Sequence, residues 1–207
     1  MNTLSDESLS NESLSNAREQ LAKDFSECRQ RLWQTVRVRM DPRLCGRVDP
    51  DDILQEAYID AEKRLPYYLQ QESYSAFVWL RLVVGQTLIN VHRRHFSTQK
   101  RNAAREVRSQ SSGNRSYQCT ATTESIVVQL ASGVTSPSQK AIRKEDVVEL
   151  TKALDSMRTM DREILILRHF EELTNKEVAQ LLGIEPKAAS IRYVRAIERL
   201  KKFMDQR

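Results

Sequence analysis

Apolar residues recur at steps of three and four along most of this chain, which is the spacing that gives an α-helix one buried face. The first such stretch covers about residues 16–40. Its apolar positions are Leu21, Phe25, Cys28, Leu32, Val36 and Met40. Asp41 precedes Pro42, and a residue before proline is disfavoured in the helical conformation. The pattern therefore predicts a first helix that ends at about Met40.

Two more helices are predicted after it. The second begins near Pro50, because Asp49 is a suitable N-cap and proline is tolerated at the first helical position. Pro66 is expected to kink or end this helix. The third covers about residues 74–95 and is apolar nearly all round, so we expect it at the centre of a bundle. Its last turn is abruptly basic, with the sequence HRRH.

Two polar stretches frame these helices. The first is a five-residue repeat, LSDES-LSNES-LSNAR, with too few apolar side chains to offset the entropy of ordering it. Residues 1–15 are therefore predicted to be a disordered tail. Ser, Thr, Gln, Asn and Arg dominate residues 97–136, which we interpret as a linker. The prediction is an all-α protein in which two small helical domains, 16–96 and 137–207, are joined by this flexible linker. The second domain is expected to contain helices at about 137–157, 161–171, 174–182 and 186–204.

Composition agrees with this fold class and excludes others. Among 207 residues only five are Gly and five are Pro, too few for a sandwich or barrel with many turns. No apolar run reaches the roughly 20 residues needed to cross a bilayer, and the acidic, polar N-terminus is no secretory signal. We therefore expect a cytoplasmic protein without membrane insertion. The three cysteines are scattered, so we predict neither a disulfide framework nor a metal site, and no cofactor.

Residues 174–202 have the features of a helix-turn-helix. Thr174 and Glu177 are spaced as a capping box, in which side chains satisfy two backbone groups at a helix start. Gly183 lies where a left-handed residue must end that helix and turn the chain. Pro186 then begins another helix almost at once. A short turn with Gly between two amphipathic helices is the signature of this motif, which we expect in the major groove of DNA.

The second helix of the motif has an outer face of one charge sign. Side chains that can pack inward are Ala189, Tyr193, Ala196, Ile197 and Leu200. Those left to face outward are Lys187, Ser190, Arg192, Arg195 and Arg199. Basic and small polar residues suit a recognition helix, whose first turns read base edges. The alternative is an ordinary amphipathic helix with a solvated basic face, but the capping box and the glycine together favour DNA binding.

An acidic cluster lies on the second predicted helix. Asp52, Gln55 and Glu56 occupy positions i, i+3 and i+4, so they share one face away from the apolar stripe. An enzyme would use such carboxylates for acid–base chemistry, but no partner histidine, phosphate loop or second carboxylate cluster accompanies them. We therefore predict no catalytic residue. Two interpretations remain: acids favoured by the helix dipole on a solvated face, or a docking face for a basic protein.

A basic run follows the third helix. Its residues are His92, Arg93, Arg94, His95, Lys100, Arg101, Arg105, Arg108 and Arg115, and Glu106 is the one acidic residue among them. A neighbourhood this cationic opposes a divalent metal and suits the neutralisation of phosphates. Tyr74, Phe77 and Trp79 precede it, and exposed aromatic groups beside basic ones hold unstacked single-stranded bases. For Phe77 a place in the core is favoured instead.

These residues resemble the sigma-70 family of bacterial RNA polymerase initiation factors, in its two-domain extracytoplasmic-function (ECF) branch. VDPDDILQEAYIDA is similar to the family's D-x-x-Q-E helix, and SAFVWLRLVVGQTLINVHRRH to its W-L-R helix with a basic end. LDSMRTMDREILILRHFEELTNKEVAQLLGIEPKAASIRYVRAIERLKKF is similar to the family's C-terminal domain almost end to end. Together these stretches cover about residues 45–96 and 140–203 in the family's order and spacing.

The resemblance implies a sigma factor that binds core RNA polymerase and directs initiation at promoter −10 and −35 elements. It implies that the residues that dock on the beta-prime clamp helices are Asp52, Gln55 and Glu56, and that the beta flap is a further polymerase contact. The residues expected to contact the −10 element are Trp79, Arg81, Gln86, Asn90, Arg93 and Arg94, with the arginines on phosphates. The residues expected to contact the −35 duplex are Arg168, Thr174, Lys187, Ser190, Arg192 and Arg195. Small sigma factors often have an anti-sigma factor as a further partner.

Four positions depart from the family pattern. Relatives commonly carry Asn and Asp where this chain has Gln86 and Asn90, and Pro and Ser where it has Met160 and Ile191.

Two rival functions also remain open. A stand-alone helix-turn-helix regulator would bind a palindrome as a dimer. A protein–protein adaptor would carry its basic helices merely as solvated faces.

Overall fold

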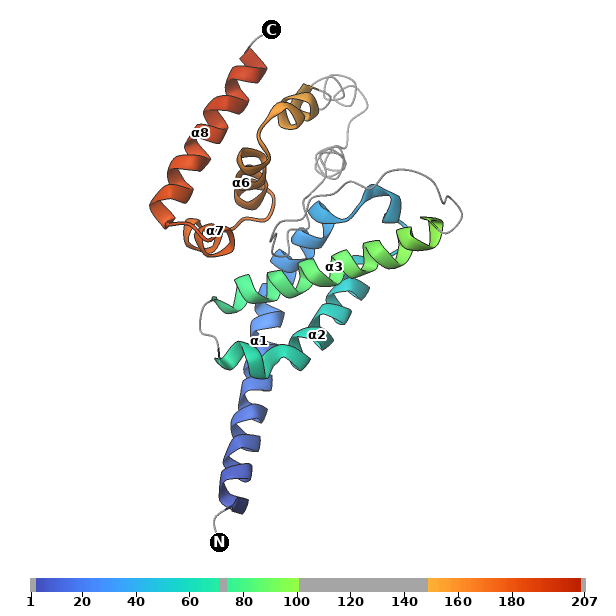
Figure 1. Ribbon diagram of the computed structural model, residues 1–207, viewed down its shortest axis with the longest axis vertical. Helices are drawn as coiled ribbons and strands as arrows, with labels where there is room; N and C mark the ends of the chain where they lie inside the picture. The colour runs from blue at the N-terminus through green and yellow to red at the C-terminus, as the bar shows by residue number, and fades with distance from the viewer. Residues whose placement is uncertain (1–2, 71–73, 101–148, 206–207) are drawn as a thin grey trace.

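The computed structural model describes residues 3–70, 74–100 and 149–205, and in these ranges every regular element is helical. Figure 1 shows two groups of helices, α1 to α3 in the N-terminal part and α6 to α8 in the C-terminal part. The predicted all-α fold class is confirmed. Most of the predicted linker lies outside the described residues, and so does the beginning of the helix predicted at 137–157.

The first helix, α1 (Thr3–Arg39), differs from the prediction at its start. A disordered tail was expected over residues 1–15, whereas the helical backbone extends back to Thr3. The reason lies in helix cooperativity. Leu32 and Val36 pack the later turns into the core, and each residue added to an existing helix gains a hydrogen bond at little cost. A polar repeat can therefore continue a helix that packing has already nucleated.

A short 3-10 turn, η1 (Pro42–Leu44), leads into α2 (Pro50–Gln70). Asp49 precedes α2 and its Oδ1 accepts a hydrogen bond from the Asp51 backbone N–H at 2.9 Å, as expected of a residue that caps a helix start. Pro66 lies inside α2, which continues past it to Gln70. Pro66 is exposed, so water can satisfy the carbonyl that loses its helical donor.

The third helix, α3 (Ala76–Lys100), lies against both α1 and α2 (Figure 1). Its buried apolar residues are Phe77, Val78, Leu80, Val83, Val84, Leu88 and Val91. They occupy several sides of the helix, which explains the near-continuous apolar sequence and confirms its predicted central place. The helix also continues into residues 97–100, which were expected to begin the linker.

The C-terminal helices bury apolar residues that belong to the same hydrophobic cluster as the buried residues of α1 to α3. Residues 149–156 are helical, and α6 (Thr159–His169), α7 (Asn175–Leu182) and α8 (Pro186–Asp205) follow. Their buried contacts include Leu154, Ile164, Leu167, Leu173, Val178, Ala189 and Ala196. Each of α6, α7 and α8 begins and ends within two residues of its predicted bounds. In the described part of the chain, no helix is both long enough and apolar enough to cross a membrane.

Candidate nucleic-acid and polymerase interface

The turn between α7 and α8 is built as the sequence predicts. Thr174 accepts a hydrogen bond from the Glu177 backbone N–H, and the Glu177 carboxylate accepts one from the Thr174 backbone N–H, so the capping box is complete. Gly183 is left-handed, with φ 63° and ψ 39°. Its conformation costs little only for a residue without a Cβ. The two helices of the motif are therefore held at a defined angle.

The outer face of α8 carries the predicted recognition residues. Lys187, Arg192 and Arg195 are exposed, and Ser190 is half-buried, while Ala189 and Ala196 pack against the core. The structure adds two apolar residues to this face. Ile191 is 43% exposed and Val194 is 50% exposed. Positions three and four apart share a helix face, so both lie between Lys187 and Arg195.

Sequence reasoning treated Ile191 only as a departure from the family and did not consider Val194. Their exposure was predictable from the sequence, because neither residue belongs to the inward stripe of α8. Large apolar side chains on a cationic recognition face can contact the methyl group of thymine in the major groove.

Arg168 and Thr174 were also predicted to contact DNA. Thr174 is exposed beside the start of α7. Arg168 is half-buried: one guanidinium nitrogen donates to the Leu173 carbonyl, and the group lies 5.4 Å from the centre of the Tyr193 ring. The Tyr193 hydroxyl in turn lies 2.9 Å from His169 Nε2. Arg168 therefore braces the contact between α6 and α8 in this conformation.

The acidic face of α2 is open to solvent at two of its three predicted residues. Asp52 and Gln55 are exposed, whereas Glu56 Oε2 lies 2.6 Å from Arg94 Nη2. Both members of this pair remain substantially exposed, so it contributes little stability and either partner can be exchanged at small cost. The pair borders a hollow of about 300 Å³ that Asp52 also lines. Residues predicted to contact polymerase and a residue predicted to contact DNA thus line the same hollow.

The other predicted −10 residues lie along α3. The Trp79 ring stacks on Tyr68 with 4.1 Å between centroids and 15° between planes. Gln86 Nε2 donates to Asn90 Oδ1 at 3.2 Å, one helical turn apart, and both are half-buried. Arg93 is exposed. Stacking on Tyr68 fixes the orientation of the half-buried Trp79 ring.

Arg81 has a different environment from the rest of its group. It is 6% exposed and forms a two-pronged ion pair with Glu171, Nε to Oε2 at 2.6 Å and Nη2 to Oε1 at 3.1 Å. Glu171 lies in the turn after α6, in the C-terminal domain. In this conformation Arg81 therefore contacts the other domain of the chain and does not face solvent.

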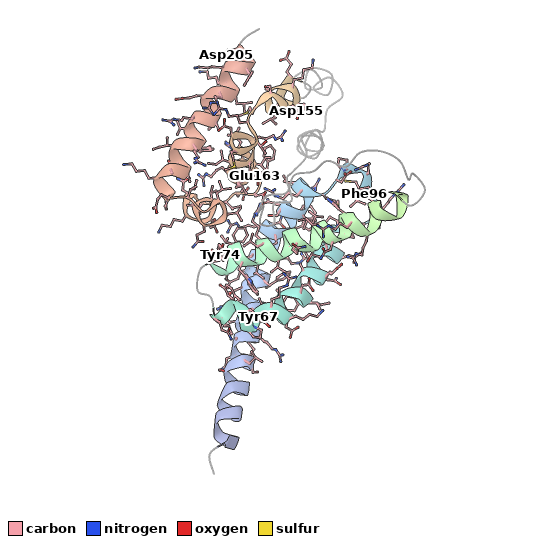
Figure 2. The ribbon with its side chains drawn as sticks, in the orientation of Figure 1. Tyr67, Tyr74, Phe96, Asp155, Glu163 and Asp205 are labelled. Carbon is pink, nitrogen blue, oxygen red and sulfur yellow. The ribbon has the colours of Figure 1, made fainter. Side chains whose placement is uncertain are left out.

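Arg39, from the end of α1, completes this network. Its Nε donates to Glu171 Oε1 at 2.6 Å, and its Nη2 lies 2.5 Å from Glu163 Oε1 on α6. Thr35 also donates to Glu171 at 3.0 Å. Figure 2 labels Glu163 on the side of the C-terminal helices that faces the N-terminal ones. We call Arg39, Arg81, Glu163 and Glu171 the interdomain charge cluster.

Burial and charge act in opposite directions on this cluster. Burial alone raises the pKa of Glu171, but the neighbouring Arg39 and Arg81 outweigh it and lower that pKa to about 2. Burial likewise lowers the pKa of Arg39, and the attraction of Glu171 and Glu163 raises it above its ordinary value. Glu171 and Arg39 are therefore both charged at neutral pH.

Sequence reasoning did not find Arg39, Glu163 or Glu171. A usable signal existed in Arg81, a charged residue in the middle of a nearly continuous apolar helix. Such a residue is rarely buried without a partner of opposite sign. The identity of that partner was not predictable, because Glu171 lies 90 residues further along the chain.

Comparison with known proteins agrees with the sequence resemblance. Residues 148–200 match the family described as Sigma-70, region 4. The ECF RNA polymerase sigma factor ShbA of Streptomyces griseus is 33% identical over 70 residues, which are 34% of this chain and 37% of that relative. The chain therefore matches little more than a third of the length of this relative.

Two solved structures are also similar. CnrH, solved in complex with the cytosolic domain of CnrY, shares the fold with a TM-score of 0.50 and 17% identity, over 93% of this chain and 94% of CnrH. The sigma factor RpoE, solved in complex with the anti-sigma factor NepR from Bartonella quintana, has a TM-score of 0.44 and 15% identity, over 89% of this chain and 98% of RpoE. At these identities the likeness concerns the fold alone, and only the first is close enough to bear on it.

Proposed function

We propose that this chain, a member of the ECF branch of the sigma-70 family, binds core RNA polymerase and directs transcription initiation at a subset of promoters. The observation that carries the proposal is the exposed basic face of α8, set by a complete capping box and a left-handed glycine within a region 4 domain. The chain itself makes no covalent bond in this proposal, since the polymerase supplies the catalysis.

The −35 element is the proposed ligand of the C-terminal domain. Lys187, Arg192 and Arg195 extend from one side of α8 and supply positive charge for phosphates and guanine edges, with Ser190 beside them. Ile191 and Val194 supply apolar contact to thymine methyl groups. In this proposal Arg168 braces α8, and Thr174, which is exposed at the start of α7, contacts the duplex backbone.

The polymerase and the −10 element are the proposed ligands of the N-terminal domain. Asp52, Gln55 and Glu56 dock on a basic surface, which the family places on the beta-prime clamp helices. The exposed Glu56–Arg94 pair exchanges its partners on assembly, so that Arg94 joins Arg93 on promoter phosphates. Trp79, Gln86 and Asn90 lie along the same helix, where melted bases would be held. Binding of the beta flap and of an anti-sigma factor stays a prediction of the family resemblance.

The decisive experiment is run-off transcription with purified bacterial core polymerase on fragmented genomic DNA from the organism of origin. Discrete transcripts that require this protein are expected, and they identify its promoters. If none appear and the protein does not co-migrate with core polymerase, the sigma proposal is wrong. A stable dimer that binds a palindrome without polymerase would then support the stand-alone regulator.

A paired variant tests the docking face. Asp52→Lys with Glu56→Lys should abolish co-migration with core polymerase, because two acidic contacts become repulsive ones. Glu19→Lys with Glu27→Lys changes the net charge equally on exposed positions of α1, so it should bind core normally. Normal binding by the first variant would remove the docking assignment.

A further inference from the structure

The contact between the two domains is a surface of matched charges. The interdomain charge cluster contains two arginines from the N-terminal domain and two glutamates from the C-terminal domain, each at most 6% exposed. Its positive and negative charges are equal in number, and each glutamate oxygen that is named in a contact faces an arginine nitrogen or the Thr35 hydroxyl. An interface with this degree of pairing has one preferred register.

A second pair lies next to the cluster and strengthens the same contact. Both terminal nitrogens of Arg31 donate to the Glu177 carboxylate, at 3.1 and 2.9 Å, and Nη2 also donates to the Glu172 carbonyl at 3.2 Å. The Arg31 guanidinium lies 3.6 Å from the centre of the Phe77 ring. Arg31 is thus held between α3 and the start of α7. An exposed contact between the same domains joins the Ser75 hydroxyl to Gln180 Oε1 at 3.2 Å.

The chemistry of this contact resembles that of a phosphate contact. Two guanidinium groups converge on a single carboxylate at Glu171, and planar guanidinium forks bind carboxylate and phosphate oxygens in the same two-pronged way. In this contact Arg81 is only 6% exposed and Glu171 holds its Nε and Nη2, so a phosphate outside the interface can reach its guanidinium group only if the domains move apart.

We propose that the surface of Arg31, Arg39 and Arg81 is a docking site for the C-terminal domain of the same chain, through Glu163, Glu171 and Glu177. Promoter DNA competes with this internal partner for Arg81. The free protein is therefore closed, and its two DNA-binding domains separate before both promoter elements are bound. The competition with DNA rests on the proposed function, whereas the docking of the domains does not.

Removal of one charge tests the docking. Glu171→Gln removes the negative charge that pairs with both Arg39 and Arg81. Separation of the two domains then lets water hydrate the two guanidinium groups. The matched control is Glu172→Gln, which makes the same charge change at the next residue, where the side chain is exposed. Only the Glu172 backbone carbonyl contributes to the interface in the described contacts, and the variant keeps it.

The state of the domains is measured by crosslinking. Ser75→Cys with Gln180→Cys, in a chain whose three native cysteines are replaced by serine, places two thiols at the edge of the contact. A short bis-maleimide crosslinker with a cleavable disulfide should join them efficiently. The initial crosslinking rate should fall about tenfold or more with Glu171→Gln and stay unchanged with Glu172→Gln. Equal rates for all three proteins would overturn the docking, and circular dichroism verifies that each variant keeps its helices.

The crosslinked chain tests the competition. Salt-dependent binding of a promoter fragment should be at least about tenfold weaker in the locked chain and recover fully when a thiol reductant cleaves the crosslink. Equal affinity before and after cleavage would overturn the competition. If the cleaved chain binds neither promoter DNA nor core polymerase, the proposed function and the competition both fail, and the crosslinking rates still decide the docking.

Discussion

Two faces of the C-terminal domain use charge in opposite ways. On the face around Glu171 the charges are buried, each held by a partner in the other domain. On the outer face of α8, Lys187, Arg192 and Arg195 are exposed to solvent. A buried charge needs a partner fixed within hydrogen-bonding distance, whereas an exposed charge is satisfied by water until a ligand arrives. The first face is thus suited to hold one internal partner and the second to take up an external one.

The largest expected effect on the buried face comes from removal of the Arg39 side chain. Arg39→Ala leaves Glu163 and Glu171 buried with less compensating charge, a change that typically costs about 3–5 kcal/mol. We expect the domains to separate, so that small-angle scattering reports a larger radius of gyration. Arg37→Ala is the control, because Arg37 is half-buried and lies over the Trp33 ring, 4.9 Å from its centre. An unchanged radius with Arg39→Ala would mean that the cluster does not hold the domains.

Low pH should weaken the contact between the domains around Glu171. Glu171 has a pKa of about 2 in the docked state and 4.5 as an ordinary carboxyl group. Because its docked pKa is the lower one, its contribution is complete above about pH 4.5 and is lost as the pH falls towards 2. We expect the radius of gyration to rise across this window in the native chain. Glu171→Gln should remove this part of the pH dependence, and a rise that is identical in the variant would assign it to other groups.

On the outer face, the largest single effect should come from Arg195. Arg195→Ala is expected to weaken binding of a −35 duplex by about tenfold to hundredfold, since one good side-chain contact to a base or phosphate is worth roughly 1–3 kcal/mol. Lys152→Ala, on the exposed part of the helix at residues 149–156, should change affinity little. Affinities measured over a range of salt concentrations test this, and similar losses for both variants would indicate binding by net charge alone.

A smaller effect sharpens the role of the apolar residues on α8. Replacing a contacted thymine by deoxyuridine removes only the 5-methyl group, and should weaken binding about fourfold, as expected for one buried methyl-sized group. Ile191→Ser or Val194→Ser should make binding insensitive to that replacement. A native-sized response of both variants to deoxyuridine would show that neither side chain contacts a thymine methyl.

Much of the fold was predictable because its signals are local. The complete capping box at Thr174 and the left-handed Gly183 were both predicted and are both present. Hydrophobic spacing also predicted the central place of α3 and the burial of Ala189 and Ala196 on α8, whereas Ile197, which was predicted to pack inward with them, is 37% exposed. The α1 extension to Thr3 was not predicted, because composition reports the preference of an isolated segment and not its attachment to a nucleated helix.

The sequence by itself determined where the helices begin and turn, and which face of α8 is basic. Those properties depend on residues within four positions of one another. Only the tertiary structure decided that Arg39 and Arg81 meet Glu171, which lies 132 and 90 residues away from them. It also decided that Trp79 stacks on Tyr68. Burial and ion pairing between distant segments depend on how whole helices pack, and a charged residue looks the same in the sequence whether it faces water, DNA or another domain.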